Sequence, residues 1–474
     1  MIFNSLTFVV FFAAVLAAYW AIPSWGARKN ILLGASYLFY AAWNPPFVLL
    51  LVLSTLIDHV AGARMAAATR PAARKAWLAF SLVANLGMLG YFKYGTFVLE
   101  NFQALLALAG ITYVPPQMNI VLPVGISFYT FQTLSYSLDI YRGQMAPVRS
   151  FRDFALYVTF FPQLVAGPIV RAVDFLPQMV NAPRPQAGRM AWGLFLMTLG
   201  LFQKAVLADT LLSGAADSVF GFRGPLAGLD AWTGVLAFSG QIFFDFAGYS
   251  TCAIGASLCL GFSLGDNFRF PYAAVGFSDF WRRWHLSLST FLRDYLYIPL
   301  GGNRSGAARM VINLVIVMLL GGLWHGAAWT FVVWGLIHGL MLVLERGLRH
   351  LFKDAAWTQT LGVQLLLGLA TYVVVCIAWV FFRAGNFGTA LGLLAAMTGN
   401  LPIAGEAILS TRQIAQVALV TVGLLGAHWL LRHTTLEAVV ARSPRWVLSG
   451  VWSLMLFTLI LNQGNGNAFI YFQF

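Results

Sequence analysis

The sequence predicts an all-α polytopic membrane protein, one integral-membrane domain over residues 1–474 with about 11 transmembrane helices plus re-entrant and interfacial helices. Three observations predict this class. Hydrophobic residues make up 59% of the chain and charged residues 9%, whereas soluble domains have about 45–50% and about 25%. Apolar runs recur along the whole chain. The 29 Lys and Arg residues lie in small groups between these runs, which is typical of charges that set the orientation of a membrane protein. This distribution argues against nucleic acid as a partner.

A membrane helix needs about 20 mostly apolar residues, and the spans are assigned on that basis. The expected spans are residues 2–22, 30–43, 47–60, 76–92, 98–112, 120–138, 154–170, 191–209, 232–262, 309–323, 325–344, 360–381, 413–431 and 446–462. Several are too short to cross alone, and others contain a proline, as at Pro123, Pro162 and Pro168. Because proline breaks a helix, we expect some of these runs to be half-helices or re-entrant segments.

Basic loops predict the orientation. These groups are Arg70, Arg74 and Lys75; Arg142, Arg149 and Arg152; Arg269, Arg282, Arg283, Arg293, Arg304 and Arg309; and Arg346, Arg349 and Lys353. By the positive-inside rule they face the cytoplasm, so residues 209–230 and 399–412 are expected to be outer loops. Cys252, Cys259 and Cys376 form no CxxC pair and lie in apolar runs, which predicts packing residues without a disulfide or a metal role.

Residues 271–300 combine aromatic and charged side chains, so they cannot cross hydrocarbon as a lone helix. Apolar side chains recur at every fourth position: Phe280, Trp284, Leu288 and Leu292. Asp279 and Arg283 have the i,i+4 spacing of a helical ion pair. This pattern predicts an amphipathic helix that enters the bilayer from the cytoplasm without crossing it, or a plain interfacial anchor. His285 lies on the apolar side of this element.

Residues 309–344 contain the second unusual pattern, two histidines within an apolar stretch. Ionisable groups in a membrane span usually face a bundle interior, and a histidine there is able to accept and return a proton near neutral pH. His325 has glycines on both sides, which favours a bend or the close approach of another helix. His338 follows thirteen residues later, so a continuous helix would separate the two by about 20 Å and leave one of them structural.

Asp245 lies on a helical stripe within the span 232–262, which points a carboxylate into the bundle. One interpretation is an ion pair with an interior base such as Lys204. The other is a role in orienting a histidine or lining a substrate path. The remaining histidines lie at span ends or beside basic residues and are expected to be structural or solvated: His59, His350, His428 and His433.

Three motifs resemble the membrane-bound O-acyltransferase (MBOAT) superfamily, and in particular its bacterial AlgI-like polysaccharide O-acetyltransferase branch. They are Ser278–His285 (SDFWRRWH), Arg293–Arg304 (RDYLYIPLGGNR) and Gly322–Gly326 (GLWHG). Four further stretches are similar to that branch: residues 123–143, 161–169, 244–255 and 469–474. Thr251 departs from the pattern, because the alginate branch commonly has Asp after the Gly-Tyr-Ser triplet, and this leaves the acceptor open.

The resemblance implies an MBOAT-like helical bundle with catalytic residues at His325 and His285. It implies transfer of an acetyl group from a cytosolic donor, acetyl-coenzyme A, with no bound cofactor and no metal. His325 would deprotonate an acceptor hydroxyl, and His285 would order the site or assist the thioester. The residues expected along the substrate and donor path are Trp324, Trp329, Arg282, Arg283, Arg293 and Asp245.

The resemblance also implies where the enzyme works and with what. The location would be the bacterial inner (cytoplasmic) membrane, in contact with lipid. The acceptor would be alginate, cellulose or another exopolysaccharide, with peptidoglycan as the alternative. The partner would be a periplasmic SGNH or esterase-like acetyltransferase, or an acyl carrier, because the chain has no outer domain large enough to position a polymer. Two further alternatives are a secondary transporter and a scaffold of an export complex without catalysis.

Overall fold

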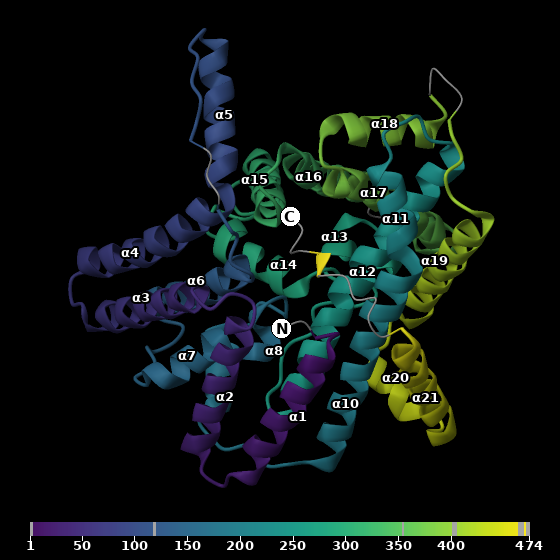
Figure 1. Cartoon of the computed structure of the whole chain (residues 1–474). Coiled ribbons are helices and arrows are strands. Elements are labelled where there is room, and N and C mark those ends of the chain that lie inside the picture. Colours follow the sequence, from purple (N-terminus) through teal and green to yellow (C-terminus); the bar gives the residue numbers. More distant parts are fainter. Residues whose placement is uncertain (1–2, 117–119, 353–354, 401–404, 463–468, 471–474) are drawn as a thin grey trace. The chain divides into compact units, whose positions relative to one another are not determined.

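The computed structural model describes residues 3–116, 120–352, 355–400, 405–462 and 469–470 (Figure 1). Apart from one isolated bridge between Leu226 and Glu406, the regular structure of these residues is helical, which confirms the predicted all-α class. The chain divides into two compact units. Unit 1 is Met1–Leu194 with Ala253–Gly265, and unit 2 is Phe195–Cys252 with Asp266–Phe474. The single domain over residues 1–474 stays a prediction.

Unit 1 contains the first helices of the chain. They are α1 (Leu6–Ala21), α2 (Trp25–Ala41), α3 (Phe47–Ala67), α4 (Pro71–Leu89), a π-helical turn (Gly90–Tyr94), α5 (Gly95–Leu108), α6 (Ile126–Tyr141), α7 (Phe151–Thr159), α8 (Phe161–Leu164), α9 (Ala172–Phe175), a 3₁₀ turn (Leu176–Met179) and the start of α10 (Ala187–Leu201). Helices α3, α4 and α6 pack together, as Figure 1 shows. Their contact surface encloses a polar cluster around Asp58, which is completely buried.

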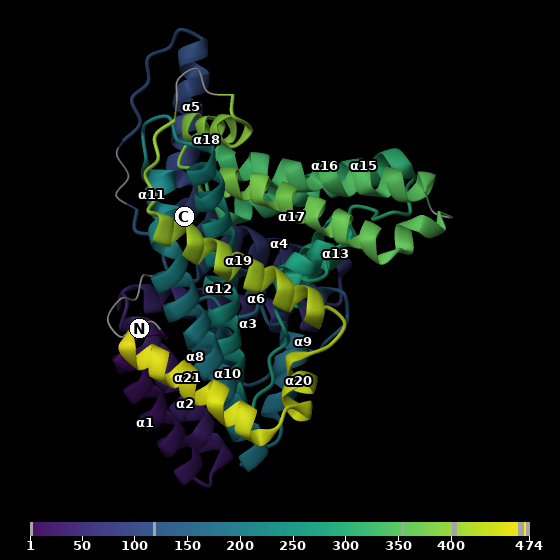
Figure 2. The same cartoon turned by 90° about the vertical axis from the view of Figure 1, so that its right-hand side faces the viewer.

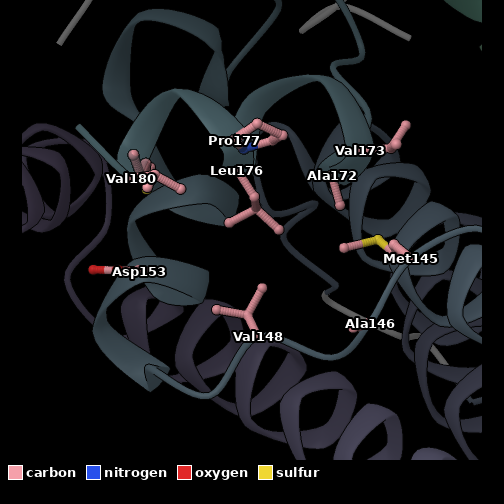
Figure 3. A pocket seen from close by; sticks show the side chains of 10 residues that line it. Met145, Ala146, Val148, Asp153, Ala172, Val173, Leu176, Pro177 and Val180 are labelled. Carbon is pink, nitrogen blue, oxygen red and sulfur yellow. The ribbon is translucent and has the colours of Figure 1, made fainter.

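Figure 3 shows a pocket of about 310 Å³ in unit 1, between the stretch that precedes α7 and the helical turns that follow α8. Its lining is apolar except for Asp153. The Asp153 carboxylate pairs with Lys29 at 2.8 Å and with Arg152 at 3.2 Å. Because the one charged group is already neutralised, this pocket offers no free acid or base for chemistry.

Unit 2 contains the remaining helices. They are the π-helical segment Phe202–Leu212 that continues α10, α11 (Ser213–Gly221), α12 (Gly228–Cys259), a 3₁₀ turn (Pro271–Ala273), α13 (Phe277–Trp281), α14 (Leu286–Leu292), a π-helical turn (Arg293–Tyr297), α15 (Ala307–His325), α16 (Trp329–Leu351), a 3₁₀ turn (Ala356–Gln359), α17 (Leu361–Arg383), α18 (Phe387–Thr398), α19 (Thr411–Leu431), α20 (Leu436–Arg442) and α21 (Arg445–Leu461). Helices α15, α16 and α17 lie side by side (Figure 2).

Seven helices of the described residues are long and apolar enough to cross a membrane. They are Phe47–Ala67, Ala187–Gly221, Gly228–Cys259, Ala307–His325, Trp329–Leu351, Leu361–Arg383 and Thr411–Leu431. Three shorter apolar helices accompany them: Leu6–Ala21, Phe387–Thr398 and Arg445–Leu461. The chain is therefore a multi-pass membrane protein, as predicted.

Several predicted elements differ from the structure. The run at 154–170 is not one helix, and its break agrees with the expectation from its prolines: the backbone leaves the helical region at Phe160, and Pro162 lies in the first turn of α8. Much of the outer loop expected at 209–230 is helical, because the Phe202–Leu212 segment and α11 continue α10 to Gly221. Helix α18 was not predicted. Part of the loop expected at 399–412 lies outside the described residues.

Residues 271–300 do not form the continuous amphipathic helix that their spacing predicts. The chain breaks between α13 and α14, and His285 has a left-handed backbone with φ 44°. The predicted apolar face is nevertheless confirmed, because all four of its side chains are buried: Phe280, Trp284, Leu288 and Leu292. The predicted Asp279–Arg283 ion pair is also present, at 2.9 Å.

Candidate active site

His325 is the last residue of α15, and α16 folds back beside α15 after three residues. Glycines make this hairpin possible. A Cβ on Gly322 would lie 2.2 Å from the carbonyl oxygen of Phe331, and a Cβ on Gly326 would lie 2.0 Å from the Phe331 ring. The close approach predicted for the glycines around His325 is thus observed, and it fixes the position of the histidine at the end of its helix.

The His325 side chain is buried among aromatic rings, with 3% of its surface exposed. Its ring meets the rings of Trp324, Trp334 and Phe382 edge-on, with centroids 5.0, 5.0 and 5.2 Å away. An imidazole in such an apolar enclosure is shielded from bulk water. Electrostatic interactions with a bound substrate are stronger there than at a surface.

His285 lies in the break between α13 and α14. A residue other than glycine rarely adopts its left-handed backbone, which persists only where neighbouring bonds enforce it. Here the backbone N–H of Leu286 donates to the Asn267 carbonyl at 2.9 Å, and the N–H of Arg269 donates to the Arg283 carbonyl at 2.9 Å. These two bonds hold the strained turn. They explain why the helical pattern of the sequence fails at this position.

Asn267 also sets the protonation of the His285 ring. Its side-chain Oδ1 accepts from the Ser287 backbone N–H at 3.3 Å and lies 3.2 Å from His285 Nδ1. A backbone N–H only donates, so the amide atom at this position is the oxygen, and Nδ1 of His285 therefore carries the proton. Burial lowers the pKa of His285 to about 3, so the ring is neutral at pH 7 and its Nε2 holds a lone pair.

The structure brings His285 and His325 together although forty positions separate them in the sequence. Their ring centroids lie 6.4 Å apart. Trp324 contacts both, at 5.0 Å from His325 and 5.8 Å from His285. Three of the residues predicted for the site therefore form one group, and their roles in catalysis stay predictions.

A cluster of indole and imidazole rings adjoins this group. The indole cluster consists of Trp281, Trp284, Trp334, Trp379 and His338. All its ring nitrogens are buried and have no hydrogen-bond partner among the described residues. Buried donors usually have a partner, so this concentration of indole N–H groups beside two histidines makes the region a candidate for binding an acceptor group of a ligand.

His338 corrects one expectation. The sequence predicted that His325 and His338 lie about 20 Å apart along one helix, but the α15–α16 hairpin folds them together. Both contact Trp334, with ring centroids 5.0 Å and 4.7 Å away. The rings of Phe280 and Trp281 also contact His338, which is fully buried.

Two of the three arginines predicted for the donor path are held by carboxylates. Arg283 pairs with Asp279 at 2.9 Å and also donates to the Arg432 carbonyl. Arg293 pairs with Asp294 at 2.6 Å. Their charges are largely neutralised, so they are less suited to bind an anionic donor than the sequence suggested.

Arg282 differs, because its hydrogen bonds go to neutral groups, the carbonyl and the hydroxyl of Ser278, at 3.0 and 2.9 Å. Its side chain lines a groove of about 810 Å³ between α13, α16 and α17. Met341 and other apolar side chains form much of the lining, and Glu345 and Arg349 pair with each other at 2.7 Å. Among the described residues of this groove, Arg282 is therefore the cation whose charge is not matched by a carboxylate.

The last two predicted path residues lie elsewhere. Asp245 on α12 forms a buried ion pair with Lys204, as one of the two interpretations of the sequence predicted. Lys204 also pairs with Asp209 at 2.8 Å. Trp329 begins α16 and is 54% exposed, so its side chain is not enclosed with the histidines.

Sequence reasoning missed Asn267 and two aromatic residues that contact the histidines. Phe246 meets the His285 ring at 4.6 Å, and Phe382 meets His325. No spacing rule connects them to the histidines, because each comes from a different part of the chain. Only Phe246 carried a hint, since it lies in the stretch 244–255 that is similar to the family branch.

The fold and the site define a class: a multi-pass membrane protein with two neighbouring histidines buried among aromatic rings. Residues 148–384 match the model of MBOAT, the membrane-bound O-acyltransferase family. The chain is 40% identical to the probable alginate O-acetylase AlgI of Azotobacter vinelandii over 88% of this chain and 83% of that protein. It is 36% identical to the AlgI protein of Pseudomonas putida over the whole of both.

A third relative is the peptidoglycan O-acetyltransferase of Helicobacter pylori, 37% identical over 84% of this chain and 80% of that protein. The chain belongs to the membrane-bound O-acyltransferase family, and it is an acyltransferase. His285 and His325 both lie within the matched residues.

Proposed function

We propose that this chain moves an acetyl group from acetyl-coenzyme A in the cytosol to an extracytoplasmic polysaccharide across the bacterial inner membrane. The observation that carries the proposal is the buried pair of His285 and His325, 6.4 Å apart, in a chain that is 40% identical to a probable alginate O-acetylase. The alginate-related name of that relative supports an exopolysaccharide acceptor. The Helicobacter pylori relative supports peptidoglycan as the second candidate.

In this mechanism His325 is the general base. It takes the proton of an acceptor hydroxyl, whose oxygen attacks the acetyl carbonyl carbon. The carbon–sulfur bond of the thioester then breaks, and the thiolate leaves with the proton that His325 returns. Indole N–H groups, such as that of Trp334 at 5.0 Å ring distance from His325, are suited to stabilise the negative charge on the carbonyl oxygen.

His285 has a supporting role in this proposal. Its Nδ1–H is engaged with Asn267, so the neutral ring directs Nε2 as a hydrogen-bond acceptor. An acceptor nitrogen that does not need to exchange a proton is suited to orient a hydroxyl or a substrate amide. The carrier of the acetyl group is a substrate, so no resident cofactor is required.

The donor would approach from the cytoplasmic side, near Arg282. The 3′-phosphate and diphosphate of coenzyme A are anions, and a guanidinium without a carboxylate partner binds such groups well. The acceptor would be presented from the other side by a periplasmic SGNH or esterase-like acetyltransferase, or by an acyl carrier.

Purified protein in liposomes tests the proposal. The liposomes contain radiolabelled acetyl-coenzyme A inside, where the cytoplasmic face of the protein points. Alginate, acetyl-free cellulose or peptidoglycan is added outside, with and without the candidate partner. We expect labelled polymer to appear, and to increase strongly when the partner is added. Label in peptidoglycan alone would favour the second candidate acceptor. Full polymer acetylation by a folded His325→Ala protein in cells would instead indicate a scaffold, and movement of label without acetyl transfer would indicate a transporter.

A further inference from the structure

Phe469 and Ile470 belong to the terminal stretch 469–474, which is similar to the family branch. The proposed mechanism gives these two residues no role. Both residues are almost completely buried, with 2% of each exposed. The Phe469 ring contacts Tyr249 at 5.0 Å and Phe246 at 5.7 Å between ring centroids. This dipeptide is therefore packed onto one turn of α12.

A hydrogen bond fixes the dipeptide at the same turn. The backbone N–H of Ile470 donates to Oδ2 of Asp245 at 2.9 Å. The other carboxylate oxygen, Oδ1, forms the ion pair with Lys204. Both oxygens of this buried carboxylate thus have a partner. One pairs with Lys204, on the π-helical segment that continues α10, and the other accepts from Ile470. Loss of either donor would leave an oxygen of the buried carboxylate unpaired, which costs free energy. The hydrogen bond from Ile470 therefore stabilises the observed position of the dipeptide.

The same turn of α12 contacts His285. Phe246 follows Asp245 directly, and its ring meets the His285 ring edge-on with centroids 4.6 Å apart. Phe469, Phe246 and His285 therefore form a continuous series of ring contacts. Asn267 holds the His285 ring through Nδ1, and Phe246 restricts the ring through van der Waals contact.

We infer that Phe469 and Ile470 are positioning residues that keep Phe246 against His285 and so keep the imidazole in its productive orientation. The inference rests on the proposed function, in which His285 orients a reacting group. The dipeptide does not touch His285 in this scheme. It acts through Phe246 and through the anchored carboxylate of Asp245.

A double-mutant cycle with Phe469→Ala and His285→Asn tests this inference in the reconstituted protein. We expect Phe469→Ala to lower kcat about tenfold with KM for acetyl-coenzyme A within about twofold, and to have little further effect when His285 is already Asn. Phe469→Leu keeps most of the apolar volume and should restore most of kcat. Phe457→Ala is the matched control, because Phe457 is 58% exposed on α21 and should leave kcat unchanged.

A purely structural dipeptide predicts a different result. The kcat of Phe469→Ala per folded molecule would then stay the same even where the melting temperature falls, or its effect would multiply with that of His285→Asn. Any of these results overturns the inference. If the wild-type protein transfers no acetyl group, the proposed function fails instead.

A second readout decides the inference without activity. Diethyl pyrocarbonate modifies accessible neutral imidazoles, and mass spectrometry measures its rate at His285. We expect the rate at His285 to rise severalfold in Phe469→Ala and not in Phe457→Ala. An unchanged rate at His285 in folded Phe469→Ala protein would show that the dipeptide does not restrain the ring.

Discussion

The polar cluster of unit 1 and the histidine site of unit 2 are both buried, yet they are built differently. In unit 1, Asp58 accepts hydrogen bonds from the hydroxyls of Ser81 and Ser137 and from the amide of Asn85. Ser54 in turn donates to Asn85 at 2.7 Å. The Asp58 carboxylate is thus supplied by donors from α4 and α6. In unit 2, the ring nitrogens of the indole cluster have no hydrogen-bond partner among the described residues.

The difference separates a structural polar group from a candidate functional one. An ionisable residue inside a membrane protein is a functional candidate by default, and Asp58 meets that description from its sequence alone. Its donors come from protein side chains, however, so a substrate would have to displace them. The indole N–H groups of the cluster beside His325 have no such partner among the described residues, which is why we propose that a substrate carbonyl is stabilised there.

The largest effect is expected for His325→Ala. Loss of the general base should lower the rate of acetyl transfer by about 10²–10⁴-fold, because that is the usual contribution of positioned proton transfer. Removal of a neutral buried ring leaves no unpaired charge, so expression and membrane insertion should stay near wild type. Transfer rates in proteoliposomes and the amount of folded protein on gel filtration check the two parts. Near-normal transfer by folded His325→Ala protein would exclude His325 as the base.

His285 should tolerate Asn better than Ala. Asn adopts a left-handed backbone more readily than Ala and offers an amide to Asn267, so His285→Asn should keep severalfold more activity than His285→Ala. His285→Gly separates the two causes, since Gly accepts the backbone but has no side chain. If all three variants have the same rate, neither backbone strain nor the Asn267 hydrogen bond explains the role of His285.

Asp58→Ala should affect stability rather than chemistry. It removes the acceptor of three side-chain hydrogen bonds, and at an average of about 0.6 kcal/mol per bond in membrane helices the loss is about 2 kcal/mol. Thermal unfolding in detergent should show a lower melting temperature, with Asp58→Asn less affected. The transfer rate per folded molecule should remain within about twofold of wild type. A large fall in that rate at normal stability would make the Asp58 cluster functional.

The smallest effect concerns the arginines. Arg282→Gln should raise KM for acetyl-coenzyme A about fivefold, which corresponds to the roughly 1 kcal/mol of an exposed ionic contact. Arg293→Gln should change KM less than about twofold, because Asp294 already neutralises that guanidinium. Equal shifts in KM for the two variants would show that the carboxylate partner does not decide which arginine binds the donor.

Sequence reasoning predicted the membrane class, the apolar face of residues 271–300 and the two histidines, because hydropathy and local motifs carry that information. The His325 segment is a clear case. Its glycines predicted a close helix approach, and the α15–α16 hairpin has it at Gly322 and Gly326. The Asp245–Lys204 ion pair was likewise among the predicted alternatives.

Periodicity failed where long-range contacts override it. The pattern around Trp284 is helical, but bonds from residues 267–269 force a left-handed turn at His285. The α15–α16 hairpin likewise brings Trp334 against His325, which a continuous helix would have kept apart. His338 lies one helical turn after Trp334 on α16 and contacts the same indole ring. Asn267 gave no signal, since its role depends on a contact across 18 residues with His285 and is invisible to local spacing.

A structure of the protein bound to a non-hydrolysable acetyl-coenzyme A analogue would show whether His285 and His325 hold the reacting acetyl group. We expect the carbonyl of the analogue to lie between His285 and His325, with its oxygen about 3 Å from an indole N–H of the cluster. The Asp58 cluster should keep all its hydrogen bonds in the same map. An analogue whose acetyl group lies away from both histidines, with the indole N–H groups still without a partner, would show that this group is not the site of acetyl transfer.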